Sequence, residues 1–168
     1  MKNSARFETL YRQYYEAIYK FCFRFLNSHD AAMDNSQETF IKLYERMKQQ
    51  GLEIENTRAW LYKVAGNLCM NSLKSKKRRQ EIENLLENQT IENTTPEHIL
   101  MRDERSTLIR KELSQLKPEQ RILILMYQDG LSYTEMAEVT GIKKNSIGKT
   151  LWRLIEKISK NIKDEANG

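Results

Sequence analysis

Hydrophobic residues recur every three to four positions along most of this chain, which is the spacing of amphipathic α-helices. The pattern predicts seven helices, at about 7–26, 31–49, 57–80, 96–116, 118–128, 132–140 and 145–161. Six glycines and two prolines are too few to interrupt helices of this length often. We therefore expect an all-α fold.

The hydrophobic stripes of these helices are expected to form the core. On the second and the last predicted helix the inward-facing positions are Phe40, Leu43, Tyr44, Met47, Ile147, Leu151, Leu154, Ile155 and Ile158. Trp60 and Leu61 fit the core of the third helix better than an exposed stacking platform. Cys22 and Cys69 lack CxxC spacing, so we expect small buried hydrophobes rather than a redox or metal site.

A polar segment, ENQTIENTTP at residues 87–96, divides the chain. Its low apolar content is typical of a linker, and Thr95 followed by Pro96 is typical of the start of the next helix. The organisation expected is two small helical domains joined by a flexible linker. The ranges are 1–80 for the first domain, 81–96 for the acidic linker and 97–168 for the second domain.

The net charge of +5 is unevenly distributed. Residues 1–79 hold 15 Lys and Arg against 8 Asp and Glu, whereas residues 80–101 hold five Glu and no Lys or Arg. Residues 102–140 have a net charge of −1 and residues 141–168 a net charge of +4. Two basic ends separated by an acidic stretch favour a polyanionic partner that contacts both, and nucleic acid is the first candidate.

A helix-turn-helix is predicted within SYTEMAEVTGIKKNSIGKTLWRL, near the C-terminus. Ser132 and Glu135 form an S-x-x-E capping box at the start of one helix, and Gly141 suits the tight turn that ends it. Asn145 is the expected N-cap of the second helix, whose outer face is basic. The spacing and the basic face favour a recognition helix in a DNA major groove, and a plain three-helix subdomain is the alternative.

Three stretches carry a family resemblance. They are DNSQETFIKLYER, RAWLYKVAGNLCMNSLKSKKRR and LSQLKPEQRILILMYQDGLSYTEMAEVTGI. The matching positions are Asp34, Gln37, Glu38, Thr39, Phe40, Tyr44, Trp60, Leu61, Ala65, Asn67, Leu113, Leu116, Pro118, Arg121, Gly130, Leu131, Ser132, Tyr133, Glu135 and Ala137. In this order, and over most of the chain, these motifs resemble those of extracytoplasmic-function sigma factors of the sigma-70 family.

The resemblance implies an alternative sigma factor, which is not an enzyme. Such a protein binds core RNA polymerase at the beta-prime clamp and beta flap, directs it to promoter DNA and initiates transcription. The polymerase-binding residues implied are Asp34, Gln37 and Glu38. Those implied in recognition and melting of the minus-ten element are Lys63, Asn67, Asn71, Lys74, Lys76, Lys77, Arg78 and Arg79. Those implied in minus-thirty-five recognition are Tyr133, Lys144, Asn145, Ser146, Lys149, Trp152 and Arg153.

The spacing of the residues does not by itself decide the function of two of these sets of residues. Asp34 and Glu38 are one helical turn apart and share a face, which is also compatible with a solvated acidic edge or a metal-binding pair. The basic run Lys76 to Arg79 is also compatible with a solvated helix end, although phosphate contacts without sequence preference are favoured.

Five positions depart from the family pattern, one of them Asn71, which stands where aspartate is common. Asn35 and Ser36 replace aliphatic residues, so the polymerase-facing helix is expected to pack or bind differently. Gly66 stands where arginine is common, and Gly148 where a basic residue is usual. Glycine in a helix costs about 1 kcal/mol relative to alanine, and Gly148 removes a candidate base contact. The upstream promoter element is therefore expected to be atypical.

Two other classes of protein remain as alternatives. One is a stand-alone helix-turn-helix regulator, and the other is a sigma-like adaptor held by a partner. No cofactor or metal is expected, since the chain has two histidines and no clustered acids. No membrane span is predicted, and the N-terminal residues MKNSARFETLYRQYY contain no secretory apolar core, so we expect a cytoplasmic protein. An anti-sigma factor, which could hold it at the membrane, is a further partner that the resemblance allows.

Overall fold

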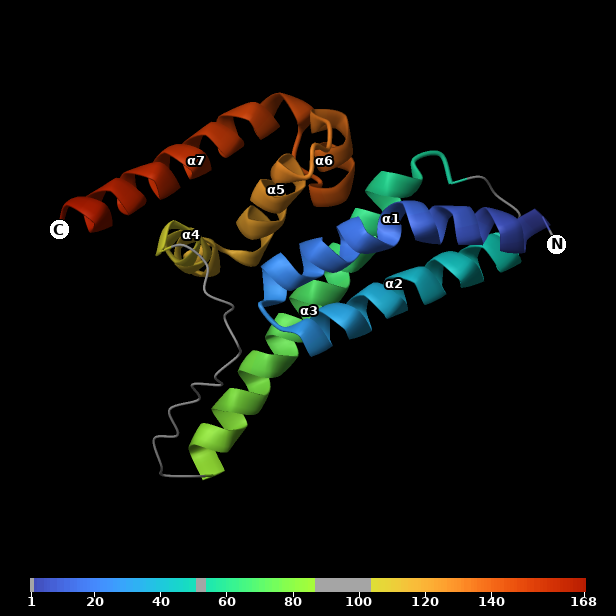
Figure 1. The fold of residues 1–168 in the computed structure, drawn as a ribbon, viewed down its shortest axis with the longest axis horizontal. Helices are drawn as coiled ribbons and strands as arrows, with labels where there is room; N and C mark the ends of the chain where they lie inside the picture. Colours follow the sequence, from blue (N-terminus) through green and yellow to red (C-terminus); the bar gives the residue numbers. More distant parts are fainter. Residues whose placement is uncertain (1, 51–53, 87–103) are drawn as a thin grey trace.

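The computed structural model describes residues 2–50, 54–86 and 104–168, all in helices or the short turns between them (Figure 1). The helices are α1 (Lys2–Leu26), α2 (His29–Gln50), α3 (Thr57–Leu86), α4 (Glu104–Gln115), α5 (Pro118–Gln128), α6 (Tyr133–Thr140) and α7 (Lys144–Asn167). The described residues contain no strand, which confirms the all-α prediction.

Helices α1, α2 and α3 form the N-terminal half. The turn between α1 and α2 is two residues long, and Asn27 adopts a left-handed conformation there with φ of 53°. Asn is one of the few residues that tolerate this conformation. The buried side chains of the three helices include Ile18, Phe21, Cys22, Phe25, Phe40, Leu43, Met47, Leu61, Tyr62, Ala65 and Cys69. The burial of both cysteines confirms that prediction.

Helix α3 is longer than the sequence predicted. It continues to Leu86, so residues 81–86, which we had assigned to the linker, are helical. The segment QEIENLL contains no glycine or proline and is rich in helix-forming residues, so nothing local ends the helix at residue 80. From Lys74 onward the side chains are exposed, and the helix extends away from the rest of the molecule (Figure 1).

Helices α4 to α7 form the C-terminal half, and its helix-turn-helix has the predicted caps. The hydroxyl of Ser132 accepts a hydrogen bond from the backbone N–H of Glu135, and the Glu135 carboxylate accepts one from the backbone N–H of Ser132. Gly141 ends α6 in the left-handed conformation, with φ of 74°. Asn145 was wrong as the N-cap of α7, because the helix begins at Lys144 and Lys143 occupies the cap position. The predicted start of a helix at Thr95–Pro96 lies outside the described residues.

Two predicted core positions are also wrong. Tyr44 and Ile155 are exposed, although both belong to hydrophobic stripes. Tyr44 lies at the edge of α2, where its ring contacts Phe7 edge-on, with the ring centres 5.3 Å apart. Ile147, Leu151 and Leu154 are buried as predicted.

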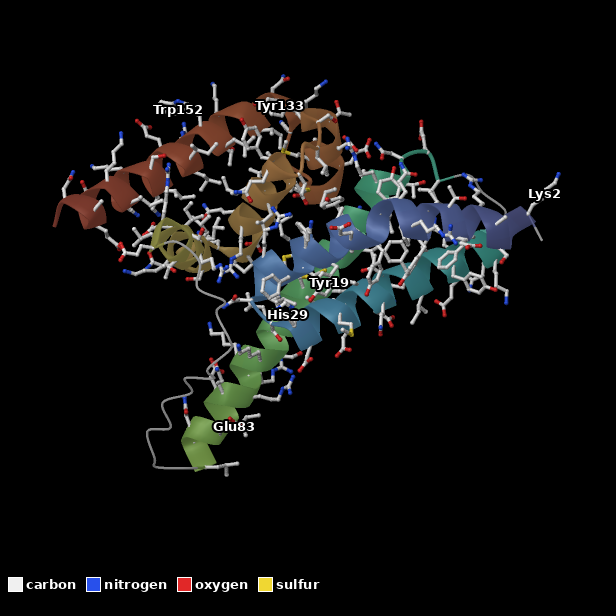
Figure 2. All side chains as sticks on the ribbon, in the orientation of Figure 1. Lys2, Tyr19, His29, Glu83, Tyr133 and Trp152 are labelled. Atoms are coloured by element: carbon white, nitrogen blue, oxygen red, sulfur yellow. The ribbon has the colours of Figure 1, made fainter. Side chains whose placement is uncertain are left out.

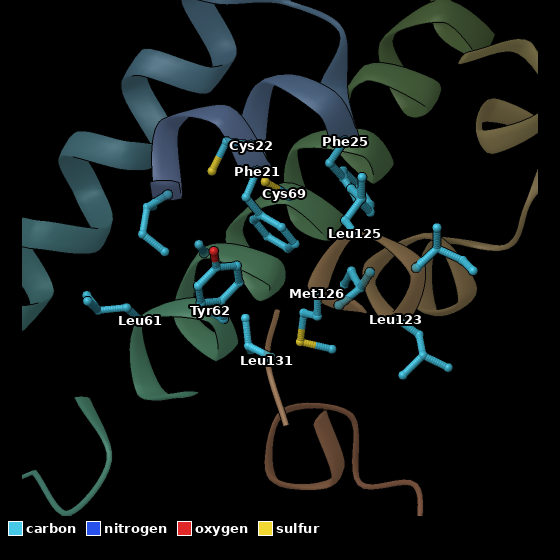
Figure 3. Close-up of a cluster of buried hydrophobic side chains, with 14 of the residues drawn as sticks. Phe21, Cys22, Phe25, Leu61, Tyr62, Cys69, Leu123, Leu125, Met126 and Leu131 are labelled. Carbon is cyan, nitrogen blue, oxygen red and sulfur yellow. The ribbon is translucent and has the colours of Figure 1, made fainter. Parts of the chain in front are cut away.

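The two halves pack against each other, which the sequence did not predict. Helix α5 lies against α1 and α3, and α6 lies against the start of α3 (Figure 1). The buried side chains of both halves form one continuous hydrophobic core. In Figure 3, Phe21 and Tyr62 of the N-terminal half lie beside Leu125, Met126 and Leu131 of the C-terminal half.

Arg121 joins the ends of two helices beneath this contact. Its guanidinium is buried and donates hydrogen bonds to the backbone carbonyls of Leu113 at 2.9 Å, Ser114 at 2.9 Å and Phe25 at 3.0 Å. The first two carbonyls belong to the end of α4 and the third to the end of α1. Carbonyls at a helix C-terminus lack partners within the helix, so one arginine satisfies groups from both halves.

Candidate polymerase and promoter interfaces

The outer face of α2 contains the predicted polymerase-binding residues. Asp34 and Gln37 are exposed and Glu38 is half-buried, with its carboxylate 3.5 Å from the Lys42 ammonium. Exposed apolar side chains flank them, because Met33 and Ile41 lie one turn to either side of Gln37. The helical spacing of residues 33, 37 and 41 could have identified these two apolar residues, but the sequence analysis did not include them.

Asn35 and Ser36 point into the protein and not toward this face. The Asn35 amide donates to the Ser72 hydroxyl at 3.0 Å, and the Ser36 hydroxyl donates to the backbone carbonyl of Ala32 at 2.6 Å. Both side chains are buried. Asn35 therefore bonds α2 to α3, whereas Ser36 bonds within α2, and neither side chain belongs to the exposed acidic face.

The exposed side of α3 contains the predicted minus-ten residues. All eight of them are exposed: Lys63, Asn67, Asn71, Lys74, Lys76, Lys77, Arg78 and Arg79. The first four form one polar stripe along the helix, and the last four follow it on the projecting segment. Trp60 is half-buried against the core, with the Arg46 guanidinium 5.6 Å from its ring centre. The polar loop before α3, residues 51–56, is a further candidate for base capture, and residues 51–53 of it lie outside the described residues.

The exposed side of the helix-turn-helix contains the predicted minus-thirty-five residues. All seven are exposed: Tyr133, Lys144, Asn145, Ser146, Lys149, Trp152 and Arg153. Figure 2 shows Tyr133 and Trp152 on the side of this half that faces away from α1, α2 and α3. Trp152 is 65% exposed, an unusual state for so large an apolar side chain.

Gly148 leaves room for the Tyr133 ring on this surface. A Cβ atom at residue 148 would lie 3.4 Å from Cε2 of Tyr133, which is ordinary contact distance. The ring of Tyr133 therefore lies directly beside Gly148 on this surface.

Arg58 and Glu135 form an ion pair between the halves that the sequence analysis missed. The Arg58 guanidinium donates two hydrogen bonds to the carboxylate, one of them from Nε to Oε2 at 2.8 Å. This bidentate contact holds the pKa of Glu135 at about 2, below its usual range, and the hydrogen bonds from Ser132 favour the charged form as well. The two residues are 77 positions apart, so no local pattern indicates the pair.

The described ranges contain neither a metal-binding cluster nor a membrane-spanning helix. Within residues 2–50, 54–86 and 104–168, no group of three or more His, Cys, Asp or Glu is arranged to hold a metal ion. No helix in the same ranges is long and apolar enough to cross a membrane.

Comparison with known proteins identifies both halves. Residues 10–79 match the family described as Sigma-70 region 2, and residues 106–158 match Sigma-70, region 4. The RNA polymerase sigma factor YlaC of Bacillus subtilis is 34% identical over 167 residues, which covers 96% of this chain and 95% of that protein. The ECF RNA polymerase sigma factor SigW of the same organism is 25% identical, covering 90% and 86%.

A solved structure has the same fold. The sigma factor RpoE from Bartonella quintana, crystallised in complex with the anti-sigma factor NepR, matches with a TM-score of 0.73. The match covers 94% of this chain and 97% of that one at 22% identity. The chain therefore belongs to the extracytoplasmic-function group of the sigma-70 family, the alternative sigma factors that direct RNA polymerase to specific promoters.

Proposed function

We propose that this sigma factor uses three separate surfaces: the outer face of α2 for core polymerase, the polar side of α3 for the minus-ten element, and the exposed face of α7 for the minus-thirty-five element. The observation that carries the proposal is that all the residues assigned to each DNA surface are exposed, and that Lys63, Asn67, Asn71 and Lys74 recur at helical spacing along one side of α3. The charged, polar and apolar groups of each surface match the polymerase or DNA partner proposed for it.

The α2 surface fits a protein partner with basic and apolar groups. Asp34 and Glu38 supply carboxylates, and Met33 and Ile41 supply exposed apolar area beside them. Interfaces of this kind bury a small apolar centre, while charges around it set orientation and association rate. The beta-prime clamp of core polymerase is the partner proposed for this face.

The α3 surface fits a melted strand. Asn67 and Asn71 offer amide donors and acceptors to base edges, and Lys63 and Lys74 bracket them with positive charge. Bases can be captured in this way only after they leave the stack, and the cations then hold the strand by its phosphates. The run from Lys76 to Arg79 would add affinity without sequence preference.

The α7 surface fits duplex DNA. Its first turns project Lys149 and Arg153 from the face opposite the buried Ile147 and Leu151. A helix of this kind enters the major groove, where long donors reach guanine O6 and N7 and apolar groups contact the thymine methyl. The exposed Trp152 would lie at the same face.

An anti-sigma factor is proposed as a further partner. The structural relative RpoE was crystallised with one, NepR. A partner of this kind would restrain the present chain, and any membrane location would depend on that partner. A stand-alone regulator is the competing proposal, and association with core polymerase separates the two.

Changing Asp34 and Glu38 to alanine together is expected to weaken binding to core polymerase about tenfold, since two exposed carboxylates leave one face of α2. The fold should be unaffected because neither side chain is buried. The measurement is a titration of core polymerase on the immobilised sigma factor. The matched control is Glu8→Ala with Glu16→Ala, which removes two exposed carboxylates from α1. Equal affinity of the two double variants would remove the α2 face from the interface.

A further inference from the structure

We propose that Cys22 and Cys69 are a site of reversible oxidation, at which hydrogen peroxide forms a disulfide that joins α1 to α3. The sequence analysis expected two unrelated buried thiols, because the two residues are far apart in the chain and lack CxxC spacing. The fold brings them together: Cys22 lies on α1, Cys69 lies on α3, and their thiols are hydrogen-bonded to each other. Figure 3 shows both side chains in the same buried cluster.

A side-chain amide contacts the Cys69 thiol. Asn35 of α2 donates to the Cys69 sulfur at 3.8 Å and to the Ser72 hydroxyl at 3.0 Å. A free cysteine in a protein interior ordinarily behaves as a small hydrophobe, and Asn35 stands where the family pattern has an aliphatic residue. This departure from the family pattern therefore places a hydrogen-bond donor beside a buried sulfur atom.

A hydroxyl group lies beside the Cys22 thiol in the same way. Ser36, which also replaces an aliphatic residue, is fully buried, and its hydroxyl hydrogen-bonds with the Cys22 thiol and donates to the backbone carbonyl of Ala32 at 2.6 Å. A hydroxyl has one hydrogen and two lone pairs, so with its hydrogen on Ala32 it accepts from the thiol. After rotation the same hydroxyl donates to a thiolate. Asn35 and Ser36 thus each supply one polar partner to the pair of thiols.

These contacts favour ionisation of Cys22. The hydrogen bond with Cys69 lowers the pKa of Cys22, burial opposes this shift, and the hydrogen bond with Ser36 lowers the pKa further. The pKa of Cys69 is raised, first by its hydrogen bond with Cys22 and then by burial. A thiolate is the nucleophile in thiol oxidation and in disulfide formation. Cys22 is therefore the attacking group and Cys69 the second thiol, which closes the disulfide.

The contact between α2 and α3 supplies a polar route from solvent to the thiols. Ser72 is half-buried, and its hydroxyl and the Asn35 side chain are joined by hydrogen bonds of 3.0 and 3.3 Å. The next contact inward from Asn35 is the Cys69 sulfur. Both cysteine side chains are 0% exposed, so only a small oxidant fits, and it enters during local opening of this contact. Hydrogen peroxide meets both requirements.

The reaction uses one molecule of hydrogen peroxide. The Cys22 thiolate attacks one peroxide oxygen, the O–O bond breaks, and the hydroxide released takes up the proton that Cys22 had lost and leaves as water. Cys22 is then a sulfenic acid. The Cys69 thiol attacks its sulfur, the S–S bond forms, the S–O bond breaks, and a second water leaves with the Cys69 proton. In total two thiols lose two electrons and two hydrogens, and the peroxide is reduced to two waters.

The disulfide has a consequence for stability. It closes a loop that contains the whole of α2, so the unfolded chain loses conformational freedom. We expect the Tm of the oxidised protein to exceed that of the reduced protein by about 5–10 °C. Cys69→Ser cannot form the bond, and its Tm should not rise on treatment with peroxide.

The test treats the reduced, folded sigma factor with hydrogen peroxide and then counts its thiols. The sample is unfolded, alkylated with iodoacetamide and analysed by mass spectrometry. Wild-type protein is expected to lose both alkylation sites and about 2 Da, and peptide mapping should recover a linked Cys22–Cys69 pair that dithiothreitol separates. Oxidised methionines gain about 16 Da each and are counted separately. In Cys69→Ser the reaction should stop at a sulfenic acid on Cys22, which dimedone traps.

A matched pair of variants tests the polar surroundings of the thiols. Asn35→Leu with Ser36→Val restores aliphatic residues and should slow disulfide formation about tenfold, because the thiols lose both polar partners. The control is Gln49→Leu with Ser159→Val, two exposed positions away from the cysteines, and it should react at the wild-type rate. Circular dichroism of both variants checks that each is folded before oxidation.

Three outcomes would overturn the proposal. The first is wild-type protein that keeps both thiols in peroxide, and the second is a disulfide that joins two chains and not the two cysteines of one chain. The third is an Asn35→Leu, Ser36→Val variant that oxidises as fast as the control. None of these measurements involves polymerase or DNA, so their results are independent of the function proposed above.

Discussion

Replacing Arg121 with alanine is expected to lower the free energy of unfolding by about 3–5 kcal/mol. The guanidinium is buried and donates to carbonyls of Leu113, Ser114 and Phe25 at the ends of two helices. The Phe25 carbonyl would lose its donor, which costs about 1–3 kcal/mol, whereas the Leu113 carbonyl keeps a hydrogen bond from the backbone N–H of Leu116 at 3.2 Å. The loss of the buried side chain, which also lies 4.9 Å over the Phe25 ring, leaves a cavity that adds to this cost. The measurement is urea unfolding followed by circular dichroism.

Two further variants separate the loss of the Arg121 hydrogen bonds from the general effect of removing a positive charge. Arg105→Ala removes an exposed arginine from α4 and should change stability by less than about 0.5 kcal/mol. Arg121→Lys keeps the charge but has one donor group in place of the planar fork, so it should recover only part of the loss. A loss for Arg121→Ala no larger than that for Arg105→Ala would show that the three carbonyls find other donors.

Replacing Arg153 with alanine is expected to relax base preference in the upstream promoter element. Arg153 is exposed on the outer face of α7, opposite Leu151 and Leu154. An arginine in the major groove can donate a bidentate pair to guanine, which is worth about 1–3 kcal/mol of discrimination. Lys149, one turn earlier, is expected to contact phosphate instead, so Lys149→Ala should weaken binding evenly across sequences.

The measurement is a binding selection on randomised upstream elements, carried out with holoenzyme containing wild-type or variant sigma factor. The minus-ten preference should be retained in Arg153→Ala, because α3 is unchanged. Lys160→Ala, at an exposed position two turns further along α7, is the matched control and should return the wild-type sequence preference. Recovery of the same upstream consensus with Arg153→Ala would mean that this residue does not read bases.

The features of the fold that are set by residues close together in the sequence were predictable. The capping box of Ser132 and Glu135 and the left-handed Gly141 each require a particular residue type at a fixed spacing, and both were found where expected. The burial of Ile147, Leu151 and Leu154 follows in the same way from helical periodicity. The three family motifs indicated the sigma factor class for the same reason.

The contact between the halves was not predictable in this way. Glu135 has two roles, as a helix cap and as the partner of Arg58, and only the first has a local signature. Gly66 lies close to Ile122 of the other half, and a Cβ atom at residue 66 would be 3.3 Å from Cδ1 of Ile122. No local pattern in the sequence indicates this contact. Helix α3 ends at Leu86 and not at the predicted residue 80, because residues 81–86 lack glycine and proline and their Glu and Leu residues are good helix formers.

This sigma factor is expected to direct RNA polymerase to its own set of promoters. The most direct test is transcription from a genomic fragment library by purified core polymerase, with and without the sigma factor, followed by mapping of the transcript start sites. We expect a limited set of start sites that depend on the sigma factor and share two sequence elements upstream. Start sites no different from those of core polymerase alone would contradict it.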